Sequence, residues 1–282
     1  MINREKQEKI IDIAWVRLYN RLAQDNLLHE REIAQHTIFQ SGGFRWAVSI
    51  AILCICTVSV WFITQNTNQL QNEWLVLHNE QNAPTLAATL RDGSIVFLSE
   101  QTTIRYPEQF REDKRMIALQ GDAFFEINRL QEQPFFIDTE LAEIEVLGTF
   151  FYVKSSDTSS FLLSVRNGEV KVTLKKNNQT IHLKAGEAVW LESDYLQITK
   201  TDINLFDSCF EKIRFKDERV TDIARIINLH STSTRLEVST ELDNRKLTIT
   251  FSGETPEMMA QLICMALNLK YKQEQNIIYI TQ

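Results

Sequence analysis

The 282-residue sequence lacks the short motifs that mark many enzymes. It contains no Gly-x-Ser-x-Gly nucleophile elbow, no His-Glu-x-x-His zinc motif and no Walker phosphate loop. It also lacks an internal repeat long enough to build a solenoid. These absences argue against the classes of hydrolase and nucleotide-binding enzyme that such motifs identify. We therefore expect neither a classical catalytic residue nor a cofactor.

Histidine and cysteine are too few and too scattered to predict a metal site. No histidine has a second His, Cys or acidic ligand at helical or hairpin metal spacing: His29, His36, His78, His182 and His230. Cys54 and Cys56 lie in one apolar run and suit small apolar fillers. Cys209 and Cys264 could pair in an oxidising compartment, but two buried thiols are the favoured interpretation.

Basic charge is also in short supply. The chain has 30 Lys and Arg against 37 Asp and Glu, and the excess of acid lies after the long apolar run, which argues against nucleic acid as a direct partner. Glu143 and Glu145 alternate on a predicted strand, a pair that would suit glycoside hydrolysis. A solvated sheet face is the commoner reason for such a pair, and we favour it.

One apolar run interrupts an otherwise globular composition. Residues 46–63 are eighteen positions without a charge, close to the roughly 20 that span a bilayer core. A cleaved signal peptide would need a charged region of 45 residues, and no cleavage site follows the run. A buried globular helix would rarely lack a polar face over this length. We therefore predict one transmembrane helix, over residues 44–64.

The basic residues predict its orientation. Residues 1–45 carry seven Lys and Arg, and after the apolar run none occurs until Arg91. Because short cytoplasmic segments are enriched in these residues, the N-terminal tail should be cytoplasmic and the larger C-terminal part external.

The tail, residues 1–43, is expected to be helical. Its main apolar side chains fall within a narrow arc of a 3.6-residue helix: Ile11, Trp15, Leu18 and Leu22. So short a tail cannot bury this face by itself, which favours a protein partner. The alternatives are packing on a second helix of the tail and lying on the membrane surface.

The external part is expected to begin with a polar linker, residues 65–84, and to continue as an all-β domain, residues 85–200. Short aromatic and β-branched runs recur there every 8 to 12 residues, as in a β-sandwich or β-roll. Asn167-Gly168 between two of these runs predicts a two-residue hairpin. Residues 206–282 alternate strand and helix patterns, with Thr255 as N-cap and Pro256 at the first helical position of the last helix, and predict a small α+β domain.

Gly148-Thr149 interrupts the apolar run EVLGTFFYV. A glycine there permits a bulge or a left-handed residue, and such kinks cluster where a strand changes sheet. A second interpretation is chemical, because a threonine hydroxyl can attack the preceding carbonyl of a bent peptide and exchange the amide for an ester. The residues alone favour the bulge.

Six stretches of the β region carry a family resemblance. They are TLRDGSIVFLSEQTTIRYPEQF (89–110), RMIALQGDAFFEI (115–127), PFFIDT (134–139), VLGTFFYV (146–153), VRNGEVKV (165–172) and LKAGEAVWL (183–191). Taken in this order, they resemble the FecR family of membrane-anchored anti-sigma factors. Residues 206–282 are similar to the small domain that ends FecR-like proteins of the Bacteroidetes type.

The resemblance implies a relay across the inner membrane. In such systems the periplasmic signalling domain of a TonB-dependent outer-membrane transporter engages the FecR-like protein, whose cytoplasmic tail controls an extracytoplasmic-function sigma factor. Some relatives cleave themselves at a Gly-Thr bond, which here matches Gly148-Thr149. Two other classes remain open, namely a structural envelope adaptor without a sigma factor and a glycan-binding module or hydrolase.

Overall fold

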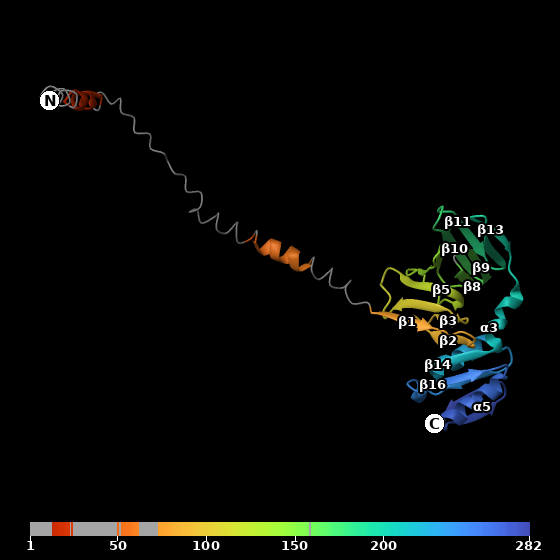
Figure 1. The fold of residues 1–282 in the computed structure, drawn as a ribbon. Coiled ribbons are helices and arrows are strands. Elements are labelled where there is room, and N and C mark those ends of the chain that lie inside the picture. Colours follow the sequence, from red (N-terminus) through yellow and green to blue (C-terminus); the bar gives the residue numbers. More distant parts are fainter. Residues whose placement is uncertain (1–12, 23, 25–49, 51, 62–72, 158) are drawn as a thin grey trace. The chain divides into compact units, whose positions relative to one another are not determined.

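A computed structural model describes residues 13–22, 24, 50, 52–61, 73–157 and 159–282. The chain divides into two compact units, residues 1–70 and Gln71–Gln282. The described residues of the first unit, 13–22, 24, 50 and 52–61, are helical, and every described strand lies in the second (Figure 1). The expected mixture of N-terminal helices and a mostly β domain with a few helices is therefore confirmed.

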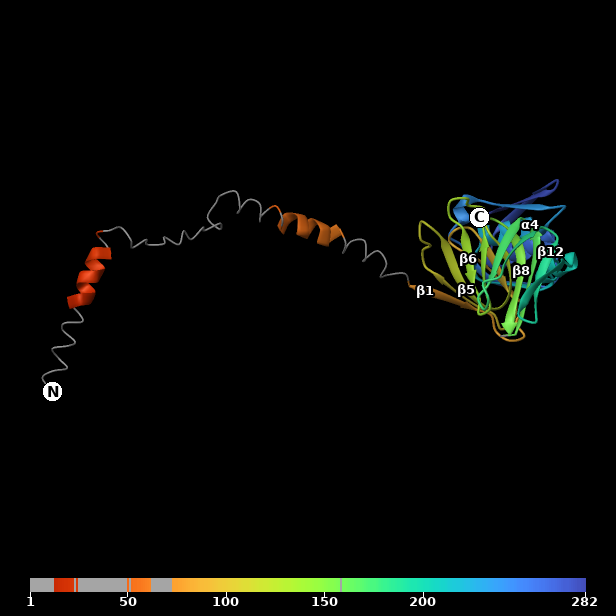
Figure 2. The ribbon, with the colours of Figure 1, turned by 90° about the horizontal axis from the view of Figure 1, so that it is seen from above.

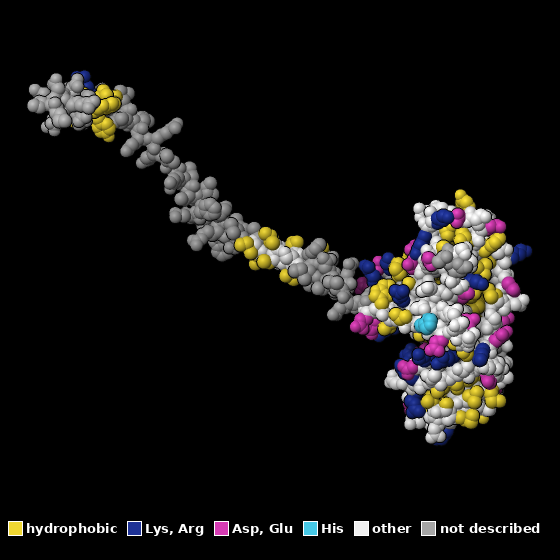
Figure 3. All heavy atoms as spheres, viewed as in Figure 1, with side chains coloured by type: hydrophobic (Ala, Val, Ile, Leu, Met, Phe, Trp, Pro, Cys, Tyr) yellow, Lys and Arg dark blue, Asp and Glu magenta, His cyan; other side chains and the backbone are white. Residues whose placement is uncertain are grey.

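The predicted membrane span is only partly described, because residues 44–49, 51 and 62–64 lie outside the described residues. Among the residues that are described, no helix is long and apolar enough to cross a membrane. Residues 50 and 52–61 are helical, and their large apolar side chains are exposed, as the hydrophobic atoms along this segment in Figure 3 show.

The second unit begins with strands that follow the predicted alternation closely. They are β1 (Trp74–His78), β2 (Thr85–Thr89), β3 (Ile95–Leu98), β4 (Thr103–Pro107), β5 (Arg115–Glu126), β6 (Phe135–Asp138), β7 (Ala142–Val146), β8 (Phe150–Asp157), β9 (Ser160–Asn167), β10 (Glu169–Leu174), β11 (Thr180–Lys184), β12 (Glu187–Glu192) and β13 (Tyr195–Lys200). The prediction of an all-β region over residues 85–200 is confirmed, whereas β1 lies within the polar linker expected at residues 65–84.

These strands form two layers that share β5. One layer has the order β1-β4-β5-β6-β7-β10-β11, and the other runs β13-β12-β9-β8-β5-β3-β2. The first half of β5 pairs with β4 and β6, and its second half pairs with β3 and β8. Gly121 lies at the change, with a φ of 110°, and a Cβ there would come within 2.6 Å of the Thr102 Oγ1. Only glycine fits this bend.

The hairpin predicted at Asn167-Gly168 is wrong. Strand β9 pairs with β8 and β12, whereas β10 pairs with β7 and β11, so the two strands lie in different layers. Gly168 does adopt a positive φ of 89°, as the turn signal required. The chain uses this freedom to turn from one layer into the other instead of folding back on itself.

The C-terminal elements also match the predicted order of strands and helices. They are η2 (Ile203–Phe206), α3 (Ser208–Glu211), β14 (Ile213–Arg219), α4 (Val220–His230), β15 (Arg235–Val238), η3 (Thr240–Leu242), β16 (Lys246–Phe251), α5 (Pro256–Leu267), β17 (Lys270–Glu274) and β18 (Ile277–Thr281). The Thr255 side chain accepts a hydrogen bond from the Met258 N–H, and Pro256 opens α5, so the predicted cap is confirmed.

The C-terminal segment joins the β region through a strand and a shared core. Strand β14 pairs in parallel with β2 and antiparallel with β16, which extends the second layer. One hydrophobic cluster combines Phe97, Phe124 and Tyr152 of that layer with residues of α4 and α5. Figures 1 and 2 show these C-terminal elements packed against the sheets. The segment thus covers the outer face of the second layer.

Candidate functional site

The Gly148-Thr149 bond lies at a corner where the chain changes layers. Strand β7 ends at Val146 and pairs with β6 and β10, whereas β8 begins at Phe150 and pairs with β5 and β9. Leu147 and Gly148 form a bend between them. The expectation that this glycine marks a change of sheet is confirmed. A register shift follows at once, between Phe150 and Phe151.

Two close approaches hold this corner. A Cβ on Gly148 would lie 2.5 Å from the Cβ and 2.6 Å from the Cα of Arg129, so the backbone leaves no room for a side chain. A Cβ on Gly168 would lie 2.5 Å from the Thr149 Cγ2 and 2.9 Å from the Gly148 carbonyl oxygen. The two corners at which the chain changes layers therefore pack on each other, with the candidate bond between them.

The Thr149 side chain is buried, and its Oγ1 has no hydrogen-bond partner. The backbone around it is fixed: the Ile127 N–H donates to the Thr149 carbonyl at 2.9 Å, and the Leu130 N–H donates to the Leu147 carbonyl at 3.1 Å. A buried hydroxyl without a partner is costly by about 1–3 kcal/mol. The corner thus presents an unengaged hydroxyl on the residue that follows the bond.

Arg115 supports the same corner from within the core. Its fully buried guanidinium forms an ion pair with the Asp92 carboxylate at 2.7 Å and donates to the carbonyls of Gln133 and Asn128, each at 2.9 Å. A longer contact of 3.5 Å reaches the carbonyl of Leu147. One cation thereby ties two loops, the one that contains Asp92 and the one between β5 and β6, to the residue before Gly148.

The predicted sigma-binding residues are described in part. Residues 13–22 are helical, and the side chains of Trp15 and Leu18 are 64% and 47% exposed. Leu22 is half-buried, and Ile11 lies outside the described residues. The spacing of residues 15, 18 and 22 places them on one face of this helix. An exposed apolar face is what a docking helix requires.

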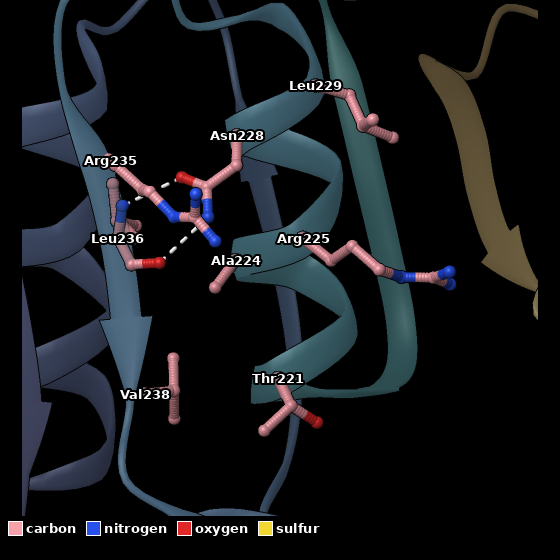
Figure 4. Close-up of a pocket in the computed structure, with 8 residues that line it drawn as sticks. All are labelled: Thr221, Ala224, Arg225, Asn228, Leu229, Arg235, Leu236 and Val238. Carbon is pink, nitrogen blue, oxygen red and sulfur yellow. Dashed lines mark hydrogen bonds between the residues drawn. The ribbon is translucent and has the colours of Figure 1, made fainter.

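A groove of about 440 Å³ separates α4 from β15. Strand β15 is the outer strand of a sheet with the order β15-β18-β17. At its open edge the Asn228 amide accepts from the Leu236 N–H and donates to the Leu236 carbonyl, both at 2.7 Å (Figure 4). This side chain takes the place that a neighbouring strand's peptide group would occupy. Figure 4 also shows Arg225 pointing away from β15.

Arg225 instead joins the C-terminal segment to the β region. It donates to the Gly93 carbonyl at 2.9 Å and lies 3.5 Å from the Asp222 carboxylate. The pKa of Glu218 is raised to about 7, mainly by burial and then by the negative charge of Asp222. Hydrogen bonds from Thr89 lower this pKa but do not cancel the rise. A protonatable carboxyl group therefore lies at the junction of β14 and β2.

The described residues give no support for a metal or a disulfide. Among them, no group of three His, Cys, Asp or Glu side chains could hold a metal ion. Cys209 and Cys264 are both buried and free, so the interpretation as two thiols is confirmed. Burial raises the pKa of the Cys209 thiol, which makes it a poor nucleophile. Glu145 is engaged by Lys171 at 2.8 Å, in keeping with a sheet-face role.

Sequence reasoning missed Arg115, Gly168 and Asn228. An arginine within the apolar run RMIAL gives no sign that it will be buried, because its partners lie in other loops. The turn signal at Gly168 does not indicate that this glycine packs on Thr149. Asn228 lies on the polar side of a predicted helix, and only the register of β15 reveals its role.

Comparisons with known proteins find one family model and similar solved structures. Residues 82–171 match the family model described as FecR protein. Two crystal structures, at 2.50 and 1.65 Å, of a "putative anti-sigma factor" from Parabacteroides distasonis ATCC 8503 are each similar, with 20% identity and a TM-score of 0.46. Each match covers 74% of this chain and 99% of that one. No curated protein matches the chain.

The identities and the TM-scores are low, so the assignment rests on the family match. That match contains the Gly148-Thr149 corner, Arg115 and Gly168. Residues 82–171 are therefore a FecR-type region, as the ordered motifs predicted.

Proposed function

We propose that this chain is a single-pass inner-membrane anti-sigma factor. In this proposal the periplasmic part receives a signal from a TonB-dependent outer-membrane transporter, and the cytoplasmic tail controls an extracytoplasmic-function sigma factor. The FecR match over residues 82–171 supports the class. The observation that carries the specific proposal is the exposed apolar face on residues 13–22, since a regulator's tail needs a surface for its client.

The tail should bind the sigma factor as a helix in a groove. Trp15 and Leu18 provide large apolar anchors, and such anchors carry most of the energy of helix recognition. Trp15→Asp should weaken binding at least tenfold, as about 2 kcal/mol per hot-spot residue implies. Arg17→Ala is the matched control, because Arg17 lies on the same helix but outside the stripe.

The assay is co-purification of the full chain with the sigma factors of its host, together with transcription from the promoters that they serve. Loss of the sigma factor from the Trp15→Asp chain, with retention by the Arg17→Ala chain, is expected. If the wild-type chain retrieves no sigma factor, a structural adaptor becomes the better explanation.

A membrane span at residues 44–64 is the second part of the proposal. The described residues 50 and 52–61 expose apolar side chains all round one helix, which suits lipid better than water. The excess of Lys and Arg before the apolar run supports a cytoplasmic tail. Protease added to spheroplasts should digest the second unit and spare the tail. A protected second unit would contradict this orientation.

Self-cleavage at Gly148-Thr149 is the third part. The Thr149 Oγ1 attacks the Gly148 carbonyl carbon, the C–N bond breaks as an ester forms, and the hydroxyl proton passes to the released Thr149 amine. Water then adds to the ester, which leaves a Gly148 carboxylate and restores the Thr149 hydroxyl. The buried, unpartnered Oγ1 and the packed corner support this reaction, because a held nucleophile has little freedom to lose.

An immunoblot of the full-length protein tests the reaction. The wild-type chain should give two fragments, whereas Thr149→Ala should give one intact band. Thr149→Ser should give two fragments again, because serine keeps the hydroxyl. A wild-type chain that stays intact would leave Gly148-Thr149 as a structural corner only.

The receiving surface is the fourth part. We place it at the open edge of β15, where the Asn228 amide holds the backbone of Leu236 and an incoming strand could replace it. Val238→Pro should weaken binding of the transporter's signalling domain, because it removes an N–H on the edge opposite β18. Val238→Thr keeps the N–H and serves as control.

A further inference from the structure

Phe150, the residue after Thr149, is anchored by the C-terminal segment. Phe150 begins β8, and its ring centroid lies 5.2 Å from that of Phe206 and 6.2 Å from that of His230. Phe206 ends η2, and His230 ends α4. Two residues from distant parts of the chain therefore meet the side chain next to Thr149.

The cationic side chain of Arg166 packs on two aromatic rings of this cluster, those of Phe150 and Phe206. The Arg166 guanidinium lies 5.5 Å from the centre of the Phe150 ring and 5.8 Å from that of Phe206. Arg166 also lies 3.9 Å from the Asp207 carboxylate, beyond the end of η2. Because Arg166 belongs to β9, it links the strand beside β8 to the segment that follows β13.

The cluster continues into the hydrophobic core between the second layer and the C-terminal segment. Phe206 is fully buried and packs edge-on against Phe124, with ring centroids 5.9 Å apart. His230 lies edge-on to Phe97 at 6.3 Å. Burial, and less strongly the charge of Arg166, lowers the pKa of His230 to about 4, so the imidazole packs as a neutral ring. Phe150 thus packs at the edge of this core, against the fully buried Phe206.

From these contacts we infer that Phe206 and His230 are positioning residues for the Gly148-Thr149 bond. The inference rests on the proposed self-cleavage. Gly168 and Arg129 hold the bond itself, and the Phe150 ring fixes the strand that leaves it. Without Phe206, Phe150 could shift, and Thr149 would move with it. A displacement of about 1 Å at a reacting group can cost roughly a hundredfold in rate.

A consequence concerns the order of events. The positioning residues come from residues 203–230, so the bond reaches its reactive geometry only when the C-terminal segment has docked on the second layer. Cleavage would then report completed folding of the whole second unit. A partner that displaced this segment before cleavage would delay it.

Two substitutions in the full-length chain test the inference. Phe206→Leu removes the ring against Phe150, and Phe251→Leu is the matched control. Phe251 is equally buried in the same core, but its ring packs on Phe215 at 6.0 Å. Pulse-labelled chains are followed for the appearance of the two fragments. We expect cleavage to slow about tenfold or more with Phe206→Leu and to change less than twofold with Phe251→Leu. Equal rates in both variants would overturn the inference.

A second readout does not depend on cleavage. In a Thr149→Ala background, hydrogen exchange of the amides of residues 150–153 is measured with and without Phe206→Leu. Faster exchange with Phe206→Leu, and no change with Phe251→Leu, is expected. Unchanged exchange in both would overturn the positioning role. If the wild-type chain is never cleaved but Phe206→Leu speeds the hydrogen exchange of residues 150–153, the self-cleavage proposal fails while the anchoring of Phe150 stands.

Discussion

Arg115 is the largest side chain that the described residues bury completely. Its guanidinium satisfies the buried Asp92 carboxylate and two loop carbonyls. Such a pair stabilises little compared with an apolar core, but removing one partner leaves an uncompensated charge. The residue next to the candidate bond therefore depends on a charge that the fold cannot easily lose.

Arg115→Met should lower the free energy of unfolding by about 3–5 kcal/mol, because Asp92 would remain buried without its cation. Urea denaturation of the second unit measures this change. Arg111→Met, at an exposed ion pair with Asp113, should change it by less than about 0.5 kcal/mol. Similar denaturation midpoints for the two variants would show that the buried pair of Arg115 with Asp92 stabilises the fold no more than an exposed pair does.

Glu218 makes stability fall as pH rises. Its pKa is near 7 in the folded chain against an ordinary 4.5, so the folded state binds the extra proton between these values. The free energy of unfolding therefore decreases through that window. At pH 8, Glu218→Gln should be more stable than wild type by about 1–2 kcal/mol after allowance for screening. Denaturation at pH 4.5 and 8, with the exposed Glu241→Gln as control, tests this, and equal pH slopes would contradict it.

His230 acts in the opposite direction. Its pKa is lowered from 6.5 to about 4 in the folded chain, so the unfolded chain binds the proton first and stability is lost as pH falls through this window. His230→Phe keeps an aromatic ring and should lose less stability between pH 7 and pH 4.5, by about 1–2 kcal/mol. Thermal denaturation at both values measures the difference. A variant as acid-sensitive as wild type would assign the effect to other groups.

At the scale of elements, β14 and the helices after it complete the second layer. They cover Phe97, Phe124 and Ile95, which would otherwise face water, and β14 covers the edge of β2. Large exposed apolar patches and open strand edges promote association. The β region should therefore not be stable without the C-terminal segment.

A chain of residues 73–200 should bind a hydrophobic dye and elute as aggregates, whereas residues 73–282 should be monomeric. Size-exclusion chromatography with light scattering distinguishes these results. A monomeric, dye-negative 73–200 fragment would show that the covering segment is dispensable for the fold.

At the scale of the whole molecule, a cut between Gly148 and Thr149 would not separate the second unit. Strand pairs cross the cut three times, because β5 pairs with β8, β7 with β10, and β2 with β14. The hydrophobic cluster between the layers also contains residues from both sides. Cleavage alone would therefore release nothing.

The two fragments should co-purify from native extracts and separate only in denaturant. An affinity tag at the C-terminus, with detection of the N-terminal fragment, provides the measurement. Recovery of the tagged fragment alone under native conditions would contradict the expected association. A signal that frees the tail must then act by unfolding this unit or by cutting elsewhere.

The sequence by itself determined which residues form strands and helices. Alternating side chains predicted β3 to β13, and the Thr255-Pro256 start predicted α5, because these patterns depend on neighbours a few residues away. Gly148 likewise marked a change of sheet, since only glycine tolerates such a close approach. The FecR match over residues 82–171 followed from motifs that are local in the same way.

Only the tertiary structure decided which elements meet. Asn167-Gly168 has the residues of a hairpin, yet β9 and β10 pair with other strands because pairing depends on long-range contacts that no local signal records. The burial of Arg115 and the contact of Phe150 with Phe206 and His230 arise for the same reason. Local patterns fix the backbone state of each segment, and packing between distant segments determines the surroundings of Thr149.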